Sequence, residues 1–375
     1  MRFASFIRTT SLVRSTSGRV VLAAAGSGKT TWIVVEVAAT QSDRVLVTTF
    51  TLLNYERIVQ KLWSDLGAIP RGVSVSPWFS FLLHDLVRPY QNHVGRHDRV
   101  SGVNLVSGQS TRGIAKSNIR YWFDSRGSIY TDKISEFVLR CDDASGGAVL
   151  RRLARLYDHI YIDEVQDLAG YDLDLVERLL RFGPPVTMVG DPRQATYTTN
   201  QAARNAKFRG EAIAEKFGEW ASSKLCAIDR QNHSYRCAPG ICRLADQIYP
   251  AYGSTESRNE RRTPHDGVVA VCSTDVAEYL NRHAPQVLRY NKGAESFEQE
   301  ALNFGNSKGL EFERVLIVPT GPIRKWLSSG DRSAVEKSLA KLYVAVTRAK
   351  QSVAFVHDGK LGLGDIVVRW TPSEP

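Results

Sequence analysis

The chain has 375 residues, of which 43% are hydrophobic and 23% charged, a balance typical of a globular protein of two ordinary domains. Its 49 lysines and arginines outnumber 39 acidic residues, which gives a formal net charge of +10. An excess of this size favours a polyanionic partner, and nucleic acid first. No apolar run approaches the roughly 18 residues that span a bilayer, so we expect no membrane partner.

The cysteines and the first residues bear on where the protein works. The five cysteines are scattered, and Cys237 and Cys242 lie at a spacing that fits no zinc site, so we expect free thiols in a cytoplasmic protein. Residues 1–19 are rich in Arg, Ser and Thr and have no acid, a composition that resembles a transit peptide. Because an apolar strand follows at once, a basic lead-in to that strand is the favoured interpretation.

A glycine loop follows the apolar run at 19–24 and precedes a helical pattern. Strand, glycine loop, Lys-Thr and helix together predict a pocket for a nucleoside triphosphate. Backbone N–H groups at the glycines would surround phosphate oxygens, Lys29 would reach the β- and γ-phosphates, and Thr30 would offer its hydroxyl to Mg²⁺. The loop comprises Ala25, Gly26, Ser27, Gly28, Lys29, Thr30 and Thr31.

Short apolar strands then alternate with amphipathic helices, the pattern of an α/β fold with parallel sheets. Between about 90 and 150 the chain is first polar and irregular, and then helical at 133–141 and 149–156. A charged stretch at 252–266 predicts an exposed loop. The expected strands lie at 45–47, 159–163, 185–189, 268–272, 314–318 and 352–356, and the expected helices at 54–66, 172–182, 239–249 and 335–348.

Two of these strands end in polar residues suited to triphosphate chemistry. Asp163 and Glu164 follow the strand 159–163, where the first could hold Mg²⁺ and the second could polarise an attacking water. Adjacent acids also occur in the first turn of helices, where they complement the dipole. Gln194 follows the strand 185–189 after a Gly-Asp-Pro turn, which leaves it free to reach a γ-phosphate.

The second half supplies candidate cations. Tyr235 and Arg236 precede a helix that begins near Pro239, and they could stack on a base and contact a γ-phosphate. Lys308 lies in a glycine turn ahead of the strand 314–318. Arg348 closes a helix, where it could neutralise charge on a transferred phosphoryl group or simply complement the helix dipole.

These motifs, in this order, resemble superfamily 1 helicases of the UvrD/Rep type over residues 20–357. They are Ala-Gly-Ser-Gly-Lys-Thr at 25–30, Thr-Phe-Thr at 49–51, Asp-Glu-Val-Gln-Asp at 163–167, Val-Gly-Asp-Pro-Arg-Gln-Ala-Thr-Tyr at 189–197, Ser-Tyr-Arg at 234–236, Ser-Lys-Gly-Leu-Glu-Phe at 307–312 and Val-Ala-Val-Thr-Arg-Ala-Lys at 344–350.

The resemblance implies two RecA-like domains with ATP and Mg²⁺ in the cleft between them. The first would span 1–228, with a small, mostly helical insertion at about 90–150, and the second 229–375. By motif match, Lys29 and Thr30 hold phosphate and metal, and Asp163 binds the metal. Glu164 is the catalytic base, Gln194 couples the γ-phosphate to domain movement, Arg236 and Arg348 are arginine fingers, Tyr235 stacks on adenine, and Glu311 contacts the ribose.

The resemblance also implies a channel for single-stranded nucleic acid, with DNA favoured and 3′→5′ movement. Stacking on aromatic rings and attraction to the backbone suit such a channel. The matching residues are Thr49, Phe50, Thr51, Trp78, Phe79, Tyr197 and Lys308.

The chain departs from the UvrD/Rep pattern in four places. No glutamine motif for adenine occurs at about 8–10, Thr198 follows Tyr197 where an aromatic is usual, Gly305 stands where a histidine is usual, and no large second insertion fits between Arg236 and Asn303. Two alternatives therefore stay open. One is an ATPase switch or motor subunit that unwinds only with a protein partner, and the other is a viral-type RNA helicase.

Overall fold

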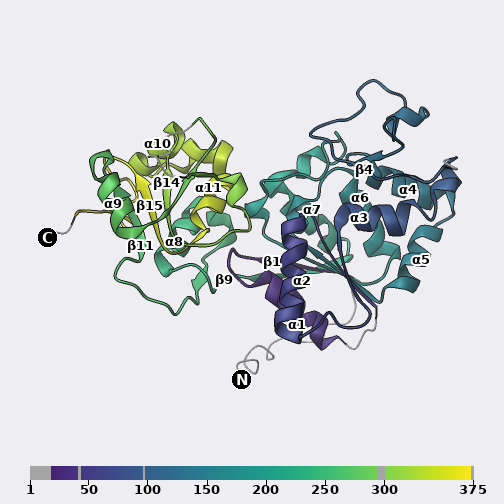
Figure 1. Cartoon of the computed structure of the whole chain (residues 1–375), viewed down its shortest axis with the longest axis horizontal. Coiled ribbons are helices and arrows are strands. Elements are labelled where there is room, and N and C mark those ends of the chain that lie inside the picture. The colour runs from purple at the N-terminus through teal and green to yellow at the C-terminus, as the bar shows by residue number, and fades with distance from the viewer. Residues whose placement is uncertain (1–17, 41–43, 96–97, 294–296, 298–299, 373–375) are drawn as a thin grey trace.

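The computed structural model contains two six-stranded parallel sheets, each covered by helices, in two lobes (Figure 1). The sheets have the orders β3-β2-β6-β7-β1-β8 and β13-β12-β14-β15-β11-β16. This is the predicted α/β class, with one sheet for each RecA-like unit. The structure describes residues 18–40, 44–95, 98–293, 297 and 300–372, so the predictions for residues 1–17 lie outside the described residues.

The first sheet places the ends of its strands along one edge. The described strands of this sheet pair in parallel throughout, so the carboxyl ends of β1, β6 and β7 lie side by side. Parallel strands are covered on both faces, and the residues of β1, β2 and β7 are accordingly almost all buried. The strands are β1 (Gly18–Ala23), β2 (Val45–Thr49), β3 (Val73–Pro77), β6 (His159–Asp163), β7 (Val186–Gly190) and β8 (Cys226–Gln231).

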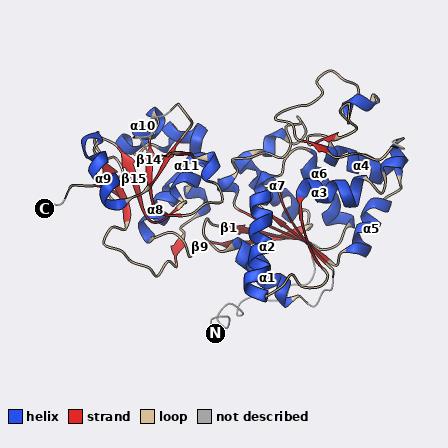
Figure 2. Cartoon of the chain, in the orientation of Figure 1, coloured by secondary structure: helices blue, strands red, loops and turns tan. Residues whose placement is uncertain are grey.

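Helices cover this sheet on both faces (Figure 2). The two helices expected within about 90–150 are present as α4 and α5. The irregular stretch before them contains the short strands β4 (Val103–Asn104) and β5 (Ile129–Tyr130) and the 3₁₀ helices η2 (Gln91–Val94) and η3 (Ile119–Tyr121). The helices are α1 (Lys29–Ala39), α2 (Leu52–Leu66), α3 (Trp78–Phe81), the π-helix η1 (Leu82–Val87), α4 (Ile134–Ala144), α5 (Ala148–Leu156), α6 (Tyr171–Phe182) and α7 (Ile213–Ser222).

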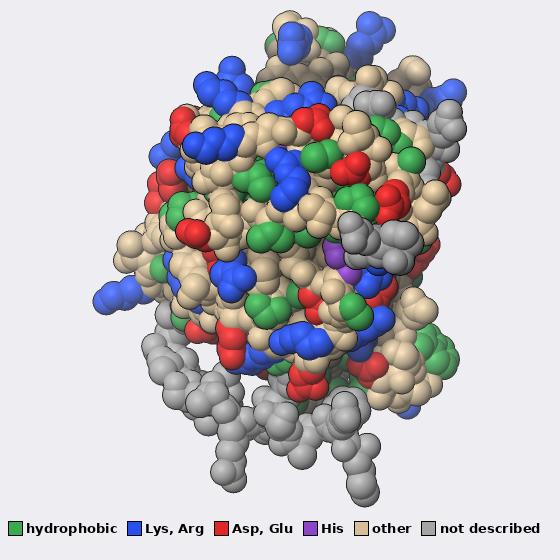
Figure 3. All heavy atoms as spheres, turned by 90° about the vertical axis from the view of Figure 1, so that its left-hand side faces the viewer, with side chains coloured by type: hydrophobic (Ala, Val, Ile, Leu, Met, Phe, Trp, Pro, Cys, Tyr) green, Lys and Arg blue, Asp and Glu red, His purple; other side chains and the backbone are tan. Residues whose placement is uncertain are grey.

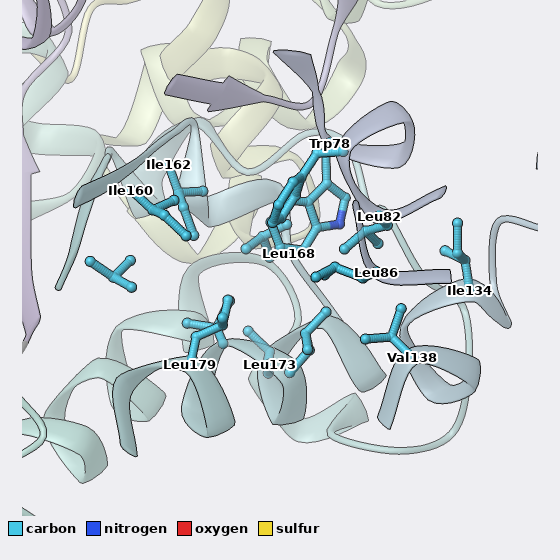
Figure 4. Close-up of a cluster of buried hydrophobic side chains, with 14 of the residues drawn as sticks. Trp78, Leu82, Leu86, Ile134, Val138, Ile160, Ile162, Leu168, Leu173 and Leu179 are labelled. Atoms are coloured by element: carbon cyan, nitrogen blue, oxygen red, sulfur yellow. The ribbon is translucent and has the colours of Figure 1, made fainter. Parts of the chain in front are cut away.

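The helices of the insertion pack into the core of the first domain. Figure 4 shows Ile134 and Val138 of α4 against Leu86 of η1 and Leu173 of α6, with Trp78 above them. These side chains are almost wholly buried. The segment is therefore part of the first domain's core and does not form a separate subdomain.

The second domain repeats the arrangement. The predicted helix at 335–348 is corrected in part, because residues 332–338 form a 3₁₀ helix and the α-helix begins only at Leu339. The strands are β11 (Gly267–Val271), β12 (Gln286–Arg289), β13 (Leu302–Asn303), β14 (Phe312–Val318), β15 (Ala349–Val356) and β16 (Val367–Arg369), and the helices are α8 (Pro239–Ile248), α9 (Val276–His283), α10 (Gly321–Ser329) and α11 (Leu339–Val346).

The domain limit and the stretch after Arg236 can be compared with the sequence predictions. The expected limit at 228 falls inside β8, whose residues up to Gln231 pair with β1 of the first sheet. Between Arg236 and Asn303 the described chain is occupied by α8, β11, α9 and β12, which are elements of the second domain itself. The described part of this stretch contains no large second insertion.

Two structural findings bear on the composition. Within the described residues, no helix is both long enough and apolar enough to span a bilayer. All five cysteines are free, and Cys141, Cys226, Cys237 and Cys242 are buried.

Candidate nucleotide site and interdomain cleft

The glycine loop leads from β1 into α1, which begins at Lys29. Gly26 and Gly28 have φ angles of +75° and +82°, a left-handed conformation that side chains disfavour. A Cβ on Gly26 would also lie 2.5 Å from the Cβ of Arg236. Glycine is therefore required here twice, by backbone conformation and by the approach of the second domain.

The loop residues fit a triphosphate. The buried hydroxyl of Ser27 has no hydrogen-bond partner, and the Lys29 ammonium donates only a long bond of 3.4 Å, to the Ala23 carbonyl. Burial lowers the pKa of Lys29, although Glu164 and Asp191 act against this shift. A cation this deeply buried and this weakly bonded is suited to an anionic ligand. The backbone N–H groups at the start of α1 are suited to the same anion, because they have no acceptor within the helix.

Two carboxylates lie at the end of β6. Asp163 is 3% exposed, and burial together with the neighbouring Glu164 raises its pKa to about 7. For Glu164, burial would raise the pKa, but Lys308 and Lys29 outweigh it and the pKa is lowered. Glu164 also adopts a left-handed φ of 54°, which turns the chain sharply after the strand.

The oxygens of Thr30 and Asp163 are of the kind that Mg²⁺ prefers. No group of three His, Cys, Asp or Glu side chains suited to a metal occurs among the described residues. Mg²⁺ binds typically through one or two protein oxygens together with substrate phosphates and water. The donor set here therefore fits Mg²⁺ that arrives with a nucleotide.

A cleft of about 410 Å³ separates the two domains and gathers most of the predicted nucleotide residues. Glu164 and Gln194 face it from the carboxyl ends of the first sheet, and Arg236 and Arg348 face it from the second domain. Its walls include Gly26, Gly28, Lys29, Thr30, Thr31, Glu164, Gln194, Arg236, Gly309, Glu311 and Arg348.

Arg348 crosses from the second domain to the first. Its Nη2 donates to Oε1 of Gln194 at 3.1 Å, while Nε donates to the Val344 carbonyl. Burial and the nearby Arg236 lower the pKa of Arg348 to about 9. The site thus concentrates positive charge where water is excluded, and that arrangement favours a bound polyanion.

Arg236 and Glu311 line this cleft, and the ring of Tyr235 lies close to Gly28 of the glycine loop. Arg236 forms an ion pair with Glu311, so the carboxylate predicted to contact a ribose is engaged by an arginine in this structure. Tyr235 is 41% exposed, and its backbone N–H donates to the Gly26 carbonyl at 2.9 Å. The adenine and ribose roles of Tyr235 and Glu311 stay predictions.

One wall of the cleft was missed by the sequence analysis. It is the exposed side of α2, where Arg57 lies against Gly309 of the second domain. The signal was available, because polar residues recur along α2 at helical spacing beside the Thr-Phe-Thr motif. The α2 residues are Asn54, Arg57, Gln60, Lys61 and Ser64.

Comparison with known families identifies the chain. The model of the viral superfamily 1 RNA helicase core domain matches residues 138–357, and an AAA domain model matches residues 11–200. The chain belongs to the superfamily 1 helicases. Neither model distinguishes the UvrD/Rep branch, which stays a prediction. No curated protein matches the sequence.

Two solved structures of arterivirus nonstructural protein 10, a helicase, resemble this superfamily 1 helicase. One is 16% identical with a TM-score of 0.45, covering 90% of this chain and 59% of the viral one. The other, a complex with DNA, is 16% identical with a TM-score of 0.44, covering 93% and 63%. The chain therefore spans about three fifths of the length of these viral proteins.

Three predicted nucleic-acid contacts of the helicase need correction, because their side chains are buried. Trp78 is 1% exposed in the core of the first domain, and its Nε1 donates to Asp172 at 3.4 Å. Thr49 is 1% exposed at the end of β2. Lys308 is turned inward, and its Nζ donates to both carboxylate oxygens of Asp167 at 2.8 Å.

The other four candidates are accessible. Phe50 and Phe79 are half-buried and meet edge to face at 5.6 Å, while the Thr51 hydroxyl caps α2. Tyr197 is 39% exposed, and its hydroxyl donates to the Gly305 carbonyl of the second domain at 3.0 Å. These residues keep their predicted role as a proposal.

At the outer end of the second domain, the side chains of the described residues form no continuous basic surface. Figure 3 shows Lys and Arg side chains there interspersed with Asp and Glu. Proteins that bind single-stranded nucleic acid without sequence preference use a positively charged groove that follows the backbone. This face therefore gives no support to a binding groove at that end of the molecule.

We predict that Lys308→Met destabilises the closed domain arrangement. The change leaves the Asp167 carboxylate buried without its cation, and breaking such a pair costs about 3–5 kcal/mol. Urea unfolding should show a lower midpoint for Lys308→Met than for the wild type. Lys308→Met combined with Asp167→Asn should recover part of the loss, and an unchanged midpoint in the single variant would contradict the prediction.

Proposed function

We propose that this superfamily 1 helicase hydrolyses ATP in the interdomain cleft and uses the resulting domain closure to move along single-stranded nucleic acid. One observation carries the proposal. Lys29 and Glu164 of the first domain face the same cleft as Arg236 and Arg348 of the second. Hydrolysis would then require both domains, which couples the reaction to their approach.

The residues divide the chemistry among them. When bound, ATP with Mg²⁺ supplies the phosphoryl group and the negative charge that the cleft neutralises. Glu164 has a lowered pKa, so it is a carboxylate at neutral pH and can orient a water and accept its proton. Lys29, Arg236 and Arg348 would neutralise charge on the phosphates, and Thr30 and Asp163 would hold the metal.

Two observations bear on the nucleic acid. The motif resemblance to UvrD/Rep proteins favours DNA and 3′→5′ movement, with Phe50, Thr51, Phe79 and Tyr197 as contacts. The match to a viral RNA helicase model favours RNA as the second candidate. ATP hydrolysis stimulated by single-stranded DNA and by single-stranded RNA, measured at one salt concentration, distinguishes them, because salt alone changes such affinities by orders of magnitude.

Unwinding by the isolated chain is a separate question. The second domain has no large insertion in its described part between Arg236 and Asn303. A motor subunit that translocates alone and unwinds only with a partner protein is therefore the alternative to a complete helicase. A strand-displacement assay with the purified monomer decides between them, since robust unwinding without any partner contradicts the motor-subunit reading.

A further inference from the structure

A buried arginine joins the two domains beside the cleft. Arg193, which follows β7 in the first domain, is 3% exposed. Its guanidinium lies between two rings of the second domain, 5.0 Å from the centre of Tyr252 and 4.9 Å from that of Tyr343. Asp191 accepts a 2.7 Å hydrogen bond from Arg193 Nε. We name Asp191, Arg193, Tyr252 and Tyr343 the interdomain latch.

The latch is hydrogen-bonded directly to Gln194, a predicted catalytic residue. Oδ2 of Asp191 accepts hydrogen bonds from Nε2 of Gln194 at 3.0 Å and from the hydroxyl of Tyr343 at 3.1 Å. With its amide nitrogen held in this way, Gln194 turns Oε1 toward Arg348, which donates to it. Tyr343 lies within α11 (Leu339–Val346) and Arg348 follows the end of that helix. One short segment of the second domain therefore bonds both to Asp191, which holds the amide nitrogen of Gln194, and to the amide oxygen of Gln194.

The latch also reaches the glycine loop. The backbone N–H of Ala25 points to the Tyr343 hydroxyl at 3.4 Å. A single tyrosine hydroxyl therefore lies between the loop that would hold phosphate and the carboxylate that holds Gln194. No other role in the proposed reaction has been assigned to Tyr343 or Arg193.

We propose that Tyr343 and Arg193 are positioning residues for ATP hydrolysis: they hold Asp191, and through it Gln194 and Arg348, in the arrangement reached when the domains close. The inference rests on the proposed function. Arg193 can occupy its place between Tyr252 and Tyr343 only while the second domain is docked. The latch therefore forms with the same movement that brings Arg348 to Gln194.

The protonation states suit these bonds. Burial raises the pKa of Tyr343 well above its ordinary value, so its hydroxyl stays protonated and donates. Burial would raise the pKa of Asp191, but Arg193 and Lys29 outweigh it and the pKa is lowered. Asp191 is thus a charged acceptor, and hydrogen bonds to charged groups are the stronger kind.

The test compares two tyrosine variants. Tyr343→Phe keeps the ring that faces Arg193 and removes only the hydroxyl. Tyr279→Phe removes another buried hydroxyl of the second domain, one bonded to His265 and absent from the cleft lining. We expect Tyr343→Phe to lower kcat for ATP hydrolysis about 10-fold with KM for ATP changed by less than about 3-fold, and Tyr279→Phe to leave both within about 2-fold.

A second background separates positioning from general damage. If Tyr343 acts through Gln194, Tyr343→Phe should change kcat by less than about 2-fold when Gln194 is already alanine. Arg193→Lys, which keeps the charge and loses the planar contact with the rings, should reproduce the loss of kcat. The inference is overturned, and the proposed function is not, if Tyr343→Phe has the kcat of the wild type. The same holds if Tyr343→Phe lowers kcat as much in the Gln194→Ala background as it does in the wild type. Absence of hydrolysis by the wild type contradicts the proposed function together with it.

Discussion

Replacing Arg348 by alanine is expected to lower kcat for ATP hydrolysis about 10³-fold, the lower end of the range for arginine fingers. Arg348 lines the cleft with Lys29 and donates to Gln194 across the domain boundary. Its removal takes away a buried positive charge at the place where negative charge would develop during hydrolysis. Steady-state hydrolysis at saturating ATP measures the effect.

The stability of the Arg348 variant should not fall in proportion. Burial lowers the pKa of Arg348 to about 9, which means that its charged form is costly without a ligand. We therefore expect a thermal midpoint near that of the wild type, with catalysis lost. Arg261→Ala is the matched control, because Arg261 is exposed and pairs only with Glu313 at the surface of the same domain. A wild-type kcat for Arg348→Ala contradicts the assignment.

Trp78→Ala is expected to destabilise the first domain by about 3–5 kcal/mol, the usual cost of truncating a fully buried tryptophan. Trp78 is 1% exposed and packs with Leu82, Leu86 and Leu168 (Figure 4). Its indole N–H also donates to Asp172. The midpoint of urea unfolding, followed by a signal from the first domain, measures the loss.

The neighbouring residue provides the control. Phe79 is half-buried beside Phe50, at a position proposed to contact nucleic acid. Phe79→Ala should weaken single-strand binding about 10-fold, the effect of losing one stacked base, and should reduce stability much less than Trp78→Ala. A stable Trp78→Ala protein with weakened single-strand binding would show that the buried assignment of Trp78 is wrong.

Much of the fold could be predicted from the sequence because parallel strands are short apolar runs. The strand predicted at 159–163 is β6 to the residue, and β7 and β14 lie where apolar runs precede polar turns. By contrast, β3 (Val73–Pro77) was not predicted, because Ser alternates with Val in a strand that is only half-buried at the sheet edge. Periodicity alone does not separate such a strand from a loop.

In the candidate site, too, the residues of local motifs could be predicted, and those whose orientation depends on distant contacts could not. The glycine loop is a local motif, so its conformation follows from adjacent residues such as Gly26 and Gly28. The inward turn of Lys308 depends on Asp167, which is distant in sequence, and the burial of Trp78 depends on α4 and α6 packing over it. Aromatic and basic residues near helicase motifs are ambiguous in sequence, because tertiary packing decides whether each one faces the core or a ligand.

The central claim is that this superfamily 1 helicase hydrolyses ATP at Lys29 in response to single-stranded nucleic acid. The most direct measurement is ATP hydrolysis by the wild type and by Lys29→Ala, each with and without single-stranded DNA or RNA at one salt concentration. We predict hydrolysis by the wild type that either strand stimulates, and none above background in Lys29→Ala. Hydrolysis that is indifferent to nucleic acid, or that persists in Lys29→Ala, would contradict the account.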